Sequence, residues 1–399
     1  MIAINDKKKC CGCAACASIC PKKAIEMKMD EEGFLYPVVN KEECIECGLC
    51  EQICPILNCK DEVENTEQKA ALVQHKDKNI VKESTAGGAF TAIAEYIIDA
   101  GGIVFGVTRE SDNTIHHVSV ESKEDLVKFR NSKYVQSNVE DSYIEVKKEL
   151  LTGRLVCFSG TPCQIEGLRH YLRREYDNLI LVDVVCRAVP SPGIWKRYIE
   201  CFETKNGKAK SIRFRDKTLG YQYSTMEIVN EKGNVFRGGI ESQLWLRMFF
   251  SGMIIRPSCT ECKFRKQYRN SDFTIWDCFN VKDIDKEFNE DCGTTRVLIH
   301  SHKAYEVFKI IQENVVFKMM DPKIIVAGVD EVFKSPKEHV LKRQFFEDAQ
   351  KMATEELFNK YFPTTLKVKL KKYVRIVLNK FGLDKMVKRI LRKVKNSRG

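Results

Sequence analysis

The chain has 399 residues, 18 of them cysteines, and a formal net charge of +11. This length predicts two or three domains. Residues 366–399 hold 13 Lys and Arg against one acid, so the rest of the chain is nearly neutral. Nucleic-acid enzymes usually carry their basic surface on the folded body, so the charge distribution disfavours a nucleic-acid partner. With no long apolar stretch and no secretory signal, we expect a cytoplasmic protein whose cysteines bind metal.

The pattern CxxCxxCxxxCP occurs twice within residues 1–60. Three thiolates of each copy can reach three irons of one [4Fe-4S] cubane, and the fourth, before proline, ligates the cluster of the other copy. One cluster is thereby assigned to Cys10, Cys13, Cys16 and Cys54, and the second to Cys20, Cys44, Cys47 and Cys50. Zinc sites usually use separated CxxC pairs, and disulfides need an oxidising compartment. We therefore predict an α+β two-cluster ferredoxin-like domain over residues 1–60, with a hairpin between its halves.

After a polar linker, residues 70–345 alternate between strand and helix patterns, which predicts an α/β domain with a largely parallel sheet. The expected strands are 71–74, 103–107, 154–159 and 179–185, and the expected helices are 89–100 and 164–173. Residues 208–240 have the pattern of antiparallel strands, and a mostly helical stretch is expected from about residue 302.

Four further cysteines are placed where they could hold a third [4Fe-4S] cluster. Cys163 follows a strand-to-helix turn, Cys186 ends the next strand, and Cys259 and Cys262 form a CxxC loop. Carboxyl ends of neighbouring parallel strands share one edge of a sheet. The alternatives are ordinary burial for the first two cysteines and zinc or a redox dithiol for the CxxC pair. Two more cysteines, Cys11 and Cys59, are expected to be spare thiols beside the ferredoxin loops.

Two segments have the composition of a nucleotide-binding site. Residues 84–88 (STAGG) join a strand to a helix, and their hydroxyls, glycines and helix N-terminus suit a phosphate. Plain N-capping explains the same residues. Residues 130–137 mix cations, hydroxyls and an aromatic ring, as a nucleotide-binding loop or a solvated surface segment does.

The last part of the chain, residues 346–399, is predicted to be a helical basic tail. It carries two apolar stripes at helical spacing, Leu366 to Phe381 and Leu383 to Val394, each opposite lysines and arginines. Such helices lie on anionic membrane surfaces, or pack on their own protein with the charged side in water. Peripheral association with the inner membrane face is therefore one interpretation of the tail.

Several of these segments together resemble the beta subunits of coenzyme F420 hydrogenases and dehydrogenases. The resemblance lies in residues 84–88, residues 132–137, Gly160–Gln164, Cys186 with residues 189–192, and residues 256–262. It implies an α/β flavin-binding domain with FAD and an adjacent cluster held by Cys163, Cys186, Cys259 and Cys262. The implied FAD contacts are Ser84, Thr85, Gly87, Gly88, Ser132, Lys133, Tyr134 and Gln136. The family's Gly-Asp-x-Trp-Gly segment stands here as residues 276–280 with only Asp277 in register, which leaves the use of coenzyme F420 open.

Clusters carry single electrons and most organic substrates exchange hydride, whereas a flavin handles both. We therefore expect an iron-sulfur flavoprotein oxidoreductase supplied by a reduced, ferredoxin-like carrier. One alternative is a coenzyme F420-coupled electron-input subunit that works with a partner redox subunit. Another is a non-catalytic electron-transfer protein with a vestigial flavin site.

Overall fold

The computed structural model describes residues 1–285, 288 and 291–381. Its N-terminal unit contains two short helices and a hairpin, as expected for an α+β ferredoxin-like unit. The helices are α1 (Ala15–Ile19) and α2 (Leu49–Gln52), and the antiparallel strands are β1 (Ile25–Met29) and β2 (Leu35–Val39). Each helix begins directly after a residue in the left-handed conformation, Ala14 and Gly48. The cysteine loops are therefore wound tightly ahead of each helix.

The body is built on a sheet of eight strands in the order β13-β3-β12-β11-β7-β6-β4-β5. The strands are β3 (Lys69–His75), β4 (Ile103–Arg109), β5 (Ile115–Val120), β6 (Val156–Gly160), β7 (Leu179–Val184), β11 (Phe273–Asp277), β12 (Thr295–Ile299) and β13 (Val315–Met320). Only the central run β11-β7-β6-β4 is parallel. The prediction of a largely parallel sheet is therefore wrong, because β5, β12, β13 and β3 all join by antiparallel pairing.

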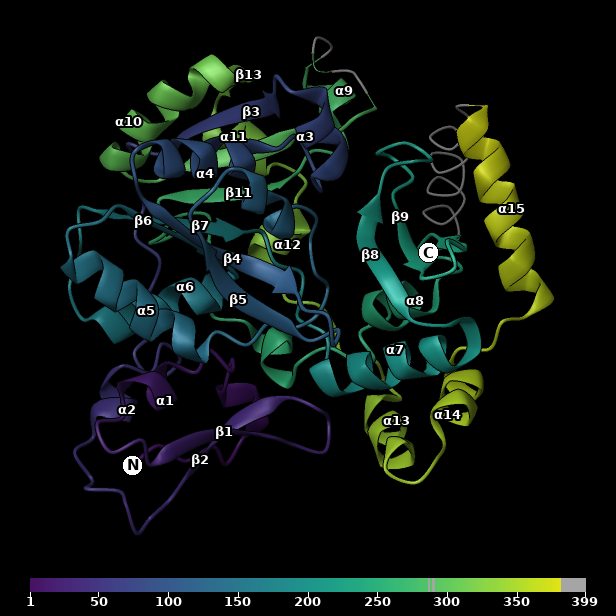
Figure 1. Cartoon of the computed structure of the whole chain (residues 1–399), viewed down its shortest axis with the longest axis horizontal. Helices are drawn as coiled ribbons and strands as arrows, with labels where there is room; N and C mark the ends of the chain where they lie inside the picture. Colours follow the sequence, from purple (N-terminus) through teal and green to yellow (C-terminus); the bar gives the residue numbers. More distant parts are fainter. Residues whose placement is uncertain (286–287, 289–290, 382–399) are drawn as a thin grey trace.

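Helices cover both faces of this sheet (Figure 1). One face packs on α4 (Ala89–Asp99) and α10 (His302–Ile311), and the opposite face packs on α5 (Glu140–Leu151) and α6 (Pro162–Leu172). The ferredoxin unit packs on that second pair, since α1 contacts both α5 and α6. Cys11, Cys13 and Ala15 thus share one hydrophobic core with Phe158 and Leu168. Shorter helices of the body are α3 (Lys78–Glu83), α9 (Val281–Ile284), α11 (Pro322–Val326) and α12 (Asp330–Phe333).

A second lobe lies beside the sheet (Figure 1). It contains the antiparallel strands β8 (Ala209–Asp216), β9 (Thr225–Asn230) and β10 (Val235–Gly238), which confirms the pattern seen over residues 208–240. Around them lie α7 (Pro192–Asn206), α8 (Leu244–Phe250), α13 (Lys342–Ala349) and α14 (Thr354–Tyr361). Phe345, Phe358 and Phe362 share a core with Trp195 and Trp245. The expected boundary at 345/346 therefore falls inside α13, and the chain belongs to this core as far as Phe362.

The helix α15 (Leu366–Lys380) follows at the outer edge of this lobe. Its stripe is exposed, with Leu366, Leu370, Val377 and Phe381 at 84, 64, 51 and 68% of full accessibility. The other expected stripe, Leu383 to Val394, lies outside the described residues. In the part of the chain that the structure describes, no helix is long and apolar enough to cross a membrane.

The ferredoxin hairpin is joined to the second lobe by backbone contact. Gly193 N–H donates to the Gly33 carbonyl at 3.0 Å, and the Ser191 hydroxyl donates to the Glu32 carbonyl at 2.6 Å. A Cβ on Gly193 would lie 2.6 Å from the Cα of Gly33, so a side chain at either position would separate the surfaces. Lys342, almost fully buried, pairs with Glu32 at 3.2 Å. The ferredoxin unit is therefore fixed to the body at a defined position.

Candidate cofactor and electron-transfer site

The first group of ferredoxin cysteines lies at the protein surface and is called the outer site here. Its members are Cys20, Cys44, Cys47 and Cys50, the four assigned to one cluster from their spacing, and all four line one small cavity. Cys47 is exposed, and the cavity is bordered by Lys22 and Met1. Four thiols around one hollow are the donor set of a [4Fe-4S] cluster, so these residues fit the group.

The second group, called the inner site here, lies against the body. Its members are Cys10, Cys13, Cys16 and Cys54, of which Cys13 and Cys16 are buried. Burial, and then the neighbouring charges of Cys10 and Cys54, raise the pKa of the Cys16 thiol. The Cys13 thiol also lies near Cys16 and Cys10. Residues 44 positions apart in the sequence are thus brought together in the pairing that the repeat predicts.

The four remaining candidate ligands also meet. Cys163, Cys186, Cys259 and Cys262 line one small cavity between the sheet edge and the ferredoxin unit. Burial, followed by the charges of Cys259, Cys163 and Cys262, raises the pKa of the Cys186 thiol well above its usual value. Burial also raises the pKa of Cys259 to about 12. Three distant segments therefore bring four thiols to one small cavity.

Local structure explains how these cysteines are presented. Cys163 opens α6 after Pro162, and a capping box between Thr161 and Gln164 fixes that turn. Cys259 lies on a short 3-10 turn over Pro257–Glu261 that begins after Arg256, and Cys262 directly follows this turn. Among the described residues, no group of three or more His, Cys, Asp or Glu side chains is arranged to hold a single metal ion. A cubane differs, since each thiolate binds its own iron.

Cys11 occupies a position that its sequence pattern does not specify. It was expected to be a spare thiol beside the ferredoxin loops. In the structure it is buried, lines the same cavity as Cys163, and packs in one cluster with Cys13 and Cys163. It therefore lies between the inner site and the third group of cysteines. Its sequence signal is indistinct, since a cysteine adjacent to Cys10 has no ligand spacing of its own.

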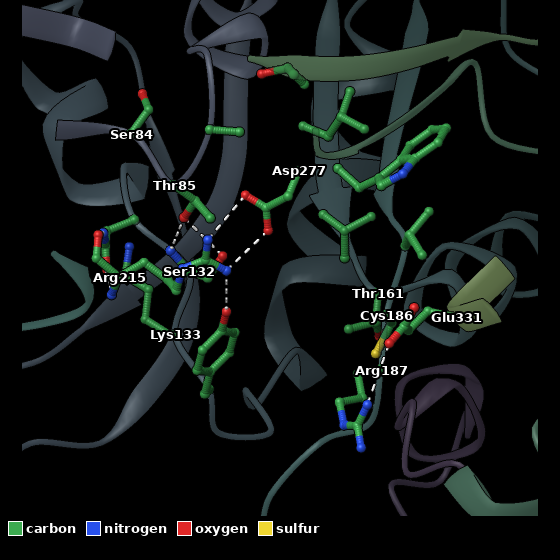
Figure 2. A pocket seen from close by; sticks show the side chains of 18 of the residues that line it. Ser84, Thr85, Ser132, Lys133, Thr161, Cys186, Arg187, Arg215, Asp277 and Glu331 are labelled. Atoms are coloured by element: carbon green, nitrogen blue, oxygen red, sulfur yellow. Dashed lines mark hydrogen bonds and ion pairs between the residues drawn. The ribbon is translucent and has the colours of Figure 1, made fainter. Parts of the chain in front are cut away.

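A cavity of about 950 Å³ opens at the carboxyl ends of the parallel strands β6, β7 and β11 (Figure 2). Ligands of α/β proteins bind at this edge, and the volume is at the upper end of the usual range for ligand pockets. Six of the eight candidate FAD contacts line it, namely Ser84, Thr85, Gly88, Ser132, Lys133 and Tyr134. Thr85 links the two segments, because its hydroxyl accepts from the Ser132 N–H at 2.7 Å and lies 2.9 Å from the Ser132 hydroxyl.

The other two candidates lie away from the cavity lining. The N–H of Gly87 donates to the Thr295 hydroxyl at 2.8 Å, and a Cβ there would lie 2.3 Å from the Val73 carbonyl oxygen. Gly87 thus allows its segment to pack closely on the sheet. Gln136 donates to the Cys11 carbonyl at 3.1 Å and accepts from Arg256 at 2.9 Å. It belongs to the junction between the ferredoxin unit and the body.

An arginine that the sequence did not single out organises one wall of the cavity (Figure 2). Arg215 pairs with Asp277 at 3.0 Å and donates to the Tyr134 hydroxyl at 3.1 Å and to the Ser224 hydroxyl at 2.7 Å. Tyr221 donates to the same Asp277 at 3.0 Å. The one family residue kept in register, Asp277, is therefore the anchor of a polar network. On the same side of the cavity, burial lowers the pKa of Lys133 to about 7.

The cavity lining also contains hydrogen-bond donors without a partner. Within the described part of the chain, Arg130 Nε, Trp276 Nε1 and Arg375 Nε are buried and make no hydrogen bond, and all three residues line the cavity. Buried donors are normally satisfied. A ligand rich in acceptors, such as the phosphate oxygens and ring carbonyls of a flavin dinucleotide, would supply the missing partners. The residues present therefore fit FAD.

The two cavities share one wall. Cys186 lines both the third cysteine cavity and the large cavity, as do Arg187, Ala188 and Val189. In Figure 2 the Cys186 sulfur lies beside Thr161 and Arg187, and Arg187 is paired with Glu331 at 3.4 Å. The position after β7 therefore joins the cysteine group to the ligand pocket.

Models of known protein families match three parts of this chain. The model of the coenzyme F420 hydrogenase/dehydrogenase beta subunit N-terminal part matches residues 71–142, and that of the C-terminal part matches residues 153–324. A 4Fe-4S dicluster domain model matches residues 9–57. Among solved structures, a chain described under xenon derivatization of the F420-reducing [NiFe] hydrogenase complex from Methanosarcina barkeri is similar at 16% identity, with a TM-score of 0.42, over 73% of this chain and 91% of that one. No curated protein matches.

Proposed function

Since the chain belongs to the coenzyme F420 hydrogenase/dehydrogenase beta subunit family, we propose that it is an iron-sulfur flavoprotein oxidoreductase with FAD in the large cavity. Its 4Fe-4S dicluster domain makes it an iron-sulfur protein of an oxidoreductase family. The finer parts of the proposal are the flavin, the third cluster and the organic reaction. The observation that carries them is the wall at Cys186, which belongs to both cavities.

The order of the cysteine groups supports electron transfer between the surface and the cavity. The outer site is at the surface, the inner site lies against the body, Cys11 touches both Cys13 and Cys163, and Cys186 borders the ligand cavity. Bound clusters would supply single electrons, and a bound flavin would exchange them with hydride. Cys50 of the outer site and Cys16 of the inner site share a hydrophobic cluster, so each neighbouring pair of sites in this series is in contact or shares a wall.

The chain's own residues suit the parts of FAD by their chemistry. Ser84, Thr85 and Gly88 precede α4, whose N-terminus favours the diphosphate. Ser132 and Lys133 add a hydroxyl and an ammonium on the facing segment. Arg215 and Tyr134, fixed by Asp277, offer further donors beside this segment.

Anaerobic purification with iron, sulfide and flavin quantitation tests the proposal. About twelve irons and one FAD per chain are expected, from three clusters of four irons each. About eight irons would rule out the third cluster, and absence of flavin would rule out the flavoenzyme. The variant Ser132→Ala with Thr85→Val should lower the flavin content while the iron content stays at about twelve. Thr152→Val, whose exposed hydroxyl bonds only within its own turn, is the matched control.

The acceptor distinguishes a stand-alone reductase from an electron-input subunit. A reductase should pass electrons from a reduced ferredoxin-like carrier to an organic acceptor without further subunits. An input subunit should react with coenzyme F420 and copurify with a partner redox subunit. Because only Asp277 of the family's Gly-Asp-x-Trp-Gly segment is kept, we favour the stand-alone reductase in the cytoplasm.

We also propose that α15 places the protein at an anionic membrane surface. Its apolar residues Leu366, Leu370 and Val377 face solvent, while Arg375 on the other side pairs with Glu241 at 2.9 Å and lies over Tyr223. Exposed lysines border the stripe on both sides at helical spacing, with Lys369 on one side and Lys367 and Lys371 on the other. Apolar centre and cationic borders together suit an interfacial helix.

Cosedimentation of the full chain with vesicles tests this surface. Binding should be stronger to vesicles containing phosphatidylglycerol than to pure phosphatidylcholine, and salt should weaken it. Leu370→Glu with Val377→Glu should abolish binding. Val316→Glu is the matched control, since Val316 is an equally exposed apolar residue on β13. Equal binding of the double variant and the control would contradict the proposal.

A further inference from the structure

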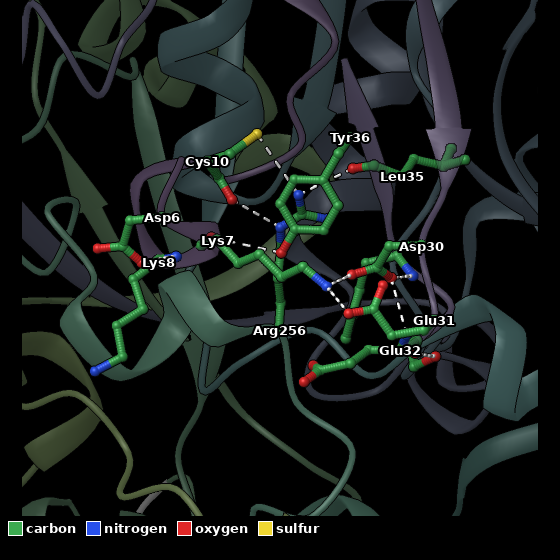
Figure 3. Close-up of polar contacts among 12 residues, drawn as sticks. Asp6, Lys7, Lys8, Cys10, Asp30, Glu31, Glu32, Leu35, Tyr36 and Arg256 are labelled. Carbon is green, nitrogen blue, oxygen red and sulfur yellow. Dashed lines mark hydrogen bonds and ion pairs between the residues drawn. The ribbon is translucent and has the colours of Figure 1, made fainter. Parts of the chain in front are cut away.

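A fully buried arginine lies between the ferredoxin unit and the body (Figure 3). Arg256 is 0% exposed, and all three of its guanidinium nitrogens donate hydrogen bonds at this junction. It donates to the Cys10 carbonyl at 2.8 Å, to the Leu35 carbonyl at 2.9 Å and to the Gln136 side-chain oxygen at 2.9 Å. Its ring neighbours are Tyr36 at 4.2 Å and Phe34 at 5.4 Å from the guanidinium carbon.

One of its contacts is to a cluster ligand. Nη2 of Arg256 lies 3.6 Å from the Cys10 sulfur, within hydrogen-bond range for sulfur. On the other side, the Cys259 N–H donates to the Arg256 carbonyl at 3.0 Å. Arg256 is therefore bound to the inner site through its side chain and adjoins the third cysteine group through its backbone.

Among the described residues, the charge of Arg256 has no carboxylate partner. Buried charges in proteins are normally paired, because desolvating an unpaired one is costly. Two arginines with little exposed side chain follow that rule, since Arg269 pairs with Asp183 and Arg215 pairs with Asp277. Arg296, also buried, makes no ion pair among the described residues and donates to the Cys278 sulfur at 3.2 Å. Arg256 differs from Arg296 because the sulfur that it contacts belongs to a candidate cluster ligand. Within the described residues, Arg256 makes no ion pair with an Asp or Glu, and the sulfur it contacts is that of Cys10. A cubane with four thiolate ligands carries the negative charge that this arrangement lacks.

The outer site has different surroundings. The cations that border it, Lys22 and the N-terminus of Met1, are exposed, and Cys47 itself faces water. Solvent and salt screen exposed charges strongly, whereas a buried charge in contact with its partner is screened far less. Cluster potentials respond to hydrogen bonds to sulfur, nearby charge and solvent exposure.

We propose that Arg256 is the counter-charge of the inner cluster and makes it easier to reduce than the outer cluster. This inference rests on the iron-sulfur part of the proposed function and is independent of the flavin. Reduction adds one electron to the cluster, with no bond made or broken, and the donor is the outer cluster after its own reduction by an external carrier. The fixed positive charge stabilises the added electron. Electrons entering at the surface would therefore settle on the cluster nearer the body.

Potentiometric titration of the anaerobic full chain, followed by electron paramagnetic resonance, tests the inference. Cys47→Ser, which alters the outer site only, identifies the outer signal. In Arg256→Gln, the ratio of reduced to oxidised inner cluster should fall about tenfold at any fixed potential, which is a 59 mV shift for one electron. The outer midpoint should stay unchanged. Arg256→Lys keeps the positive charge without the planar guanidinium, so it should shift the inner midpoint by less than Arg256→Gln does.

Arg197→Gln is the matched control, because Arg197 also donates to backbone carbonyls, of Ala349 and Met352, but far from any cysteine group. An inner midpoint unchanged in Arg256→Gln at full iron content would overturn the inference, as would equal shifts of both clusters. If Arg256→Gln loses iron, Gln136→Glu decides, because it places a carboxylate beside the guanidinium and should lower the inner midpoint. An inner midpoint identical to wild type in Gln136→Glu overturns the inference. A chain with both ferredoxin signals and no flavin would refute the proposed flavoenzyme yet still allow this measurement.

Discussion

The two halves of the ferredoxin repeat have the same cysteine spacing and opposite surroundings. In the outer half Cys47 is exposed, whereas in the inner half Cys13 is buried in a core shared with Tyr143 and Leu168 of the body. Spacing within each loop sets which thiols can share a cluster. Docking on the body sets how dry and how charged each cluster's environment is. The same motif can thus serve as an entrance on one side and as an internal relay on the other.

Removing one ligand from each half should give the largest effect and expose the difference between them. Cys13→Ser and Cys47→Ser should each lose about four of twelve irons. Only Cys13→Ser should also lower the unfolding temperature of the body, because a Cβ on Gly167 of α6 would lie 2.8 Å from the Cβ of Cys13 and the two surfaces are tightly packed. Iron assays and differential scanning calorimetry measure both. Equal loss of body stability would contradict the comparison.

The next largest difference is expected between the glycines of the two cysteine loops, in how much stability each loses when replaced by alanine. Gly12 has φ +69°, and a Cβ there would lie 2.6 Å from Arg256 Nη1. Gly48 has φ +73°, but the nearest atom would be 3.9 Å away. Gly12→Ala should therefore cost about 3 kcal/mol, from left-handed strain plus overpacking, and Gly48→Ala about 1 kcal/mol from strain alone. Chemical denaturation of the anaerobic holoprotein measures both values, and similar costs would show that the junction is not tightly packed.

Cys11 tests whether the inner half passes directly into the third cysteine group. Cys11→Ala should keep about twelve irons and lower stability by about 1 kcal/mol, since a small buried side chain is truncated. The control is Cys59→Ala, because Cys59 is half-exposed and its contacts to two carbonyl oxygens and the Lys266 ammonium are all 3.6 Å or longer. A loss of about four irons in Cys11→Ala alone would make Cys11 a cluster ligand and redraw the boundary between the two sites.

Lowering the pH should reduce the stability of the body more than that of the ferredoxin unit. This is the smallest of the expected effects. Burial lowers the pKa of His117 to about 4 and that of His300 to about 3, and residues 1–60 contain no histidine. The unfolded chain binds protons at these positions near pH 6.5 and the folded chain does not, so stability is lost as pH falls from about 6.5 toward 4. Tryptophan fluorescence reports on the body alone, since Trp195, Trp245 and Trp276 all lie there. His117→Gln should flatten part of this dependence.

What the sequence could predict was local or periodic. The strands at 103–109 and 179–184 and the helix at 89–99 were recognised within a few residues, because buried runs and helical spacing are carried by neighbouring residues. The cysteine groups were predicted because ligand spacing and strand ends are sequence features. The edge strands β5 and β13 were missed, since their exposed faces weaken the apolar pattern.

Long-range partners escaped prediction for a physical reason. Arg256 and Gln136 meet across 120 positions, and Arg215 meets Asp277 across 62, so no local pattern identifies either pair. Gly87 and Gln136 were grouped with the flavin contacts through the resemblance. In the structure, the Gly87 N–H donates to Thr295 of the sheet, and the Gln136 side chain donates to the Cys11 carbonyl at the junction. The sequence does not distinguish a buried arginine from an exposed one, so only the fold shows which arginines are buried.

The backbone contact between Gly33 and Gly193 has a consequence for the evolution and engineering of this chain. In sequence, the ferredoxin unit with its polar linker resembles a detachable module that any small ferredoxin could replace. A contact of this kind admits no side chain on either surface, so a substitute must present glycine at the same tip of its hairpin. We therefore expect fusions with unrelated ferredoxins to fail at docking, even when their clusters are intact, unless this tip is grafted with them. After fusion, neither Gly33 nor Gly193 could be replaced without disturbing the other surface, so the ferredoxin unit and the body would be inherited together.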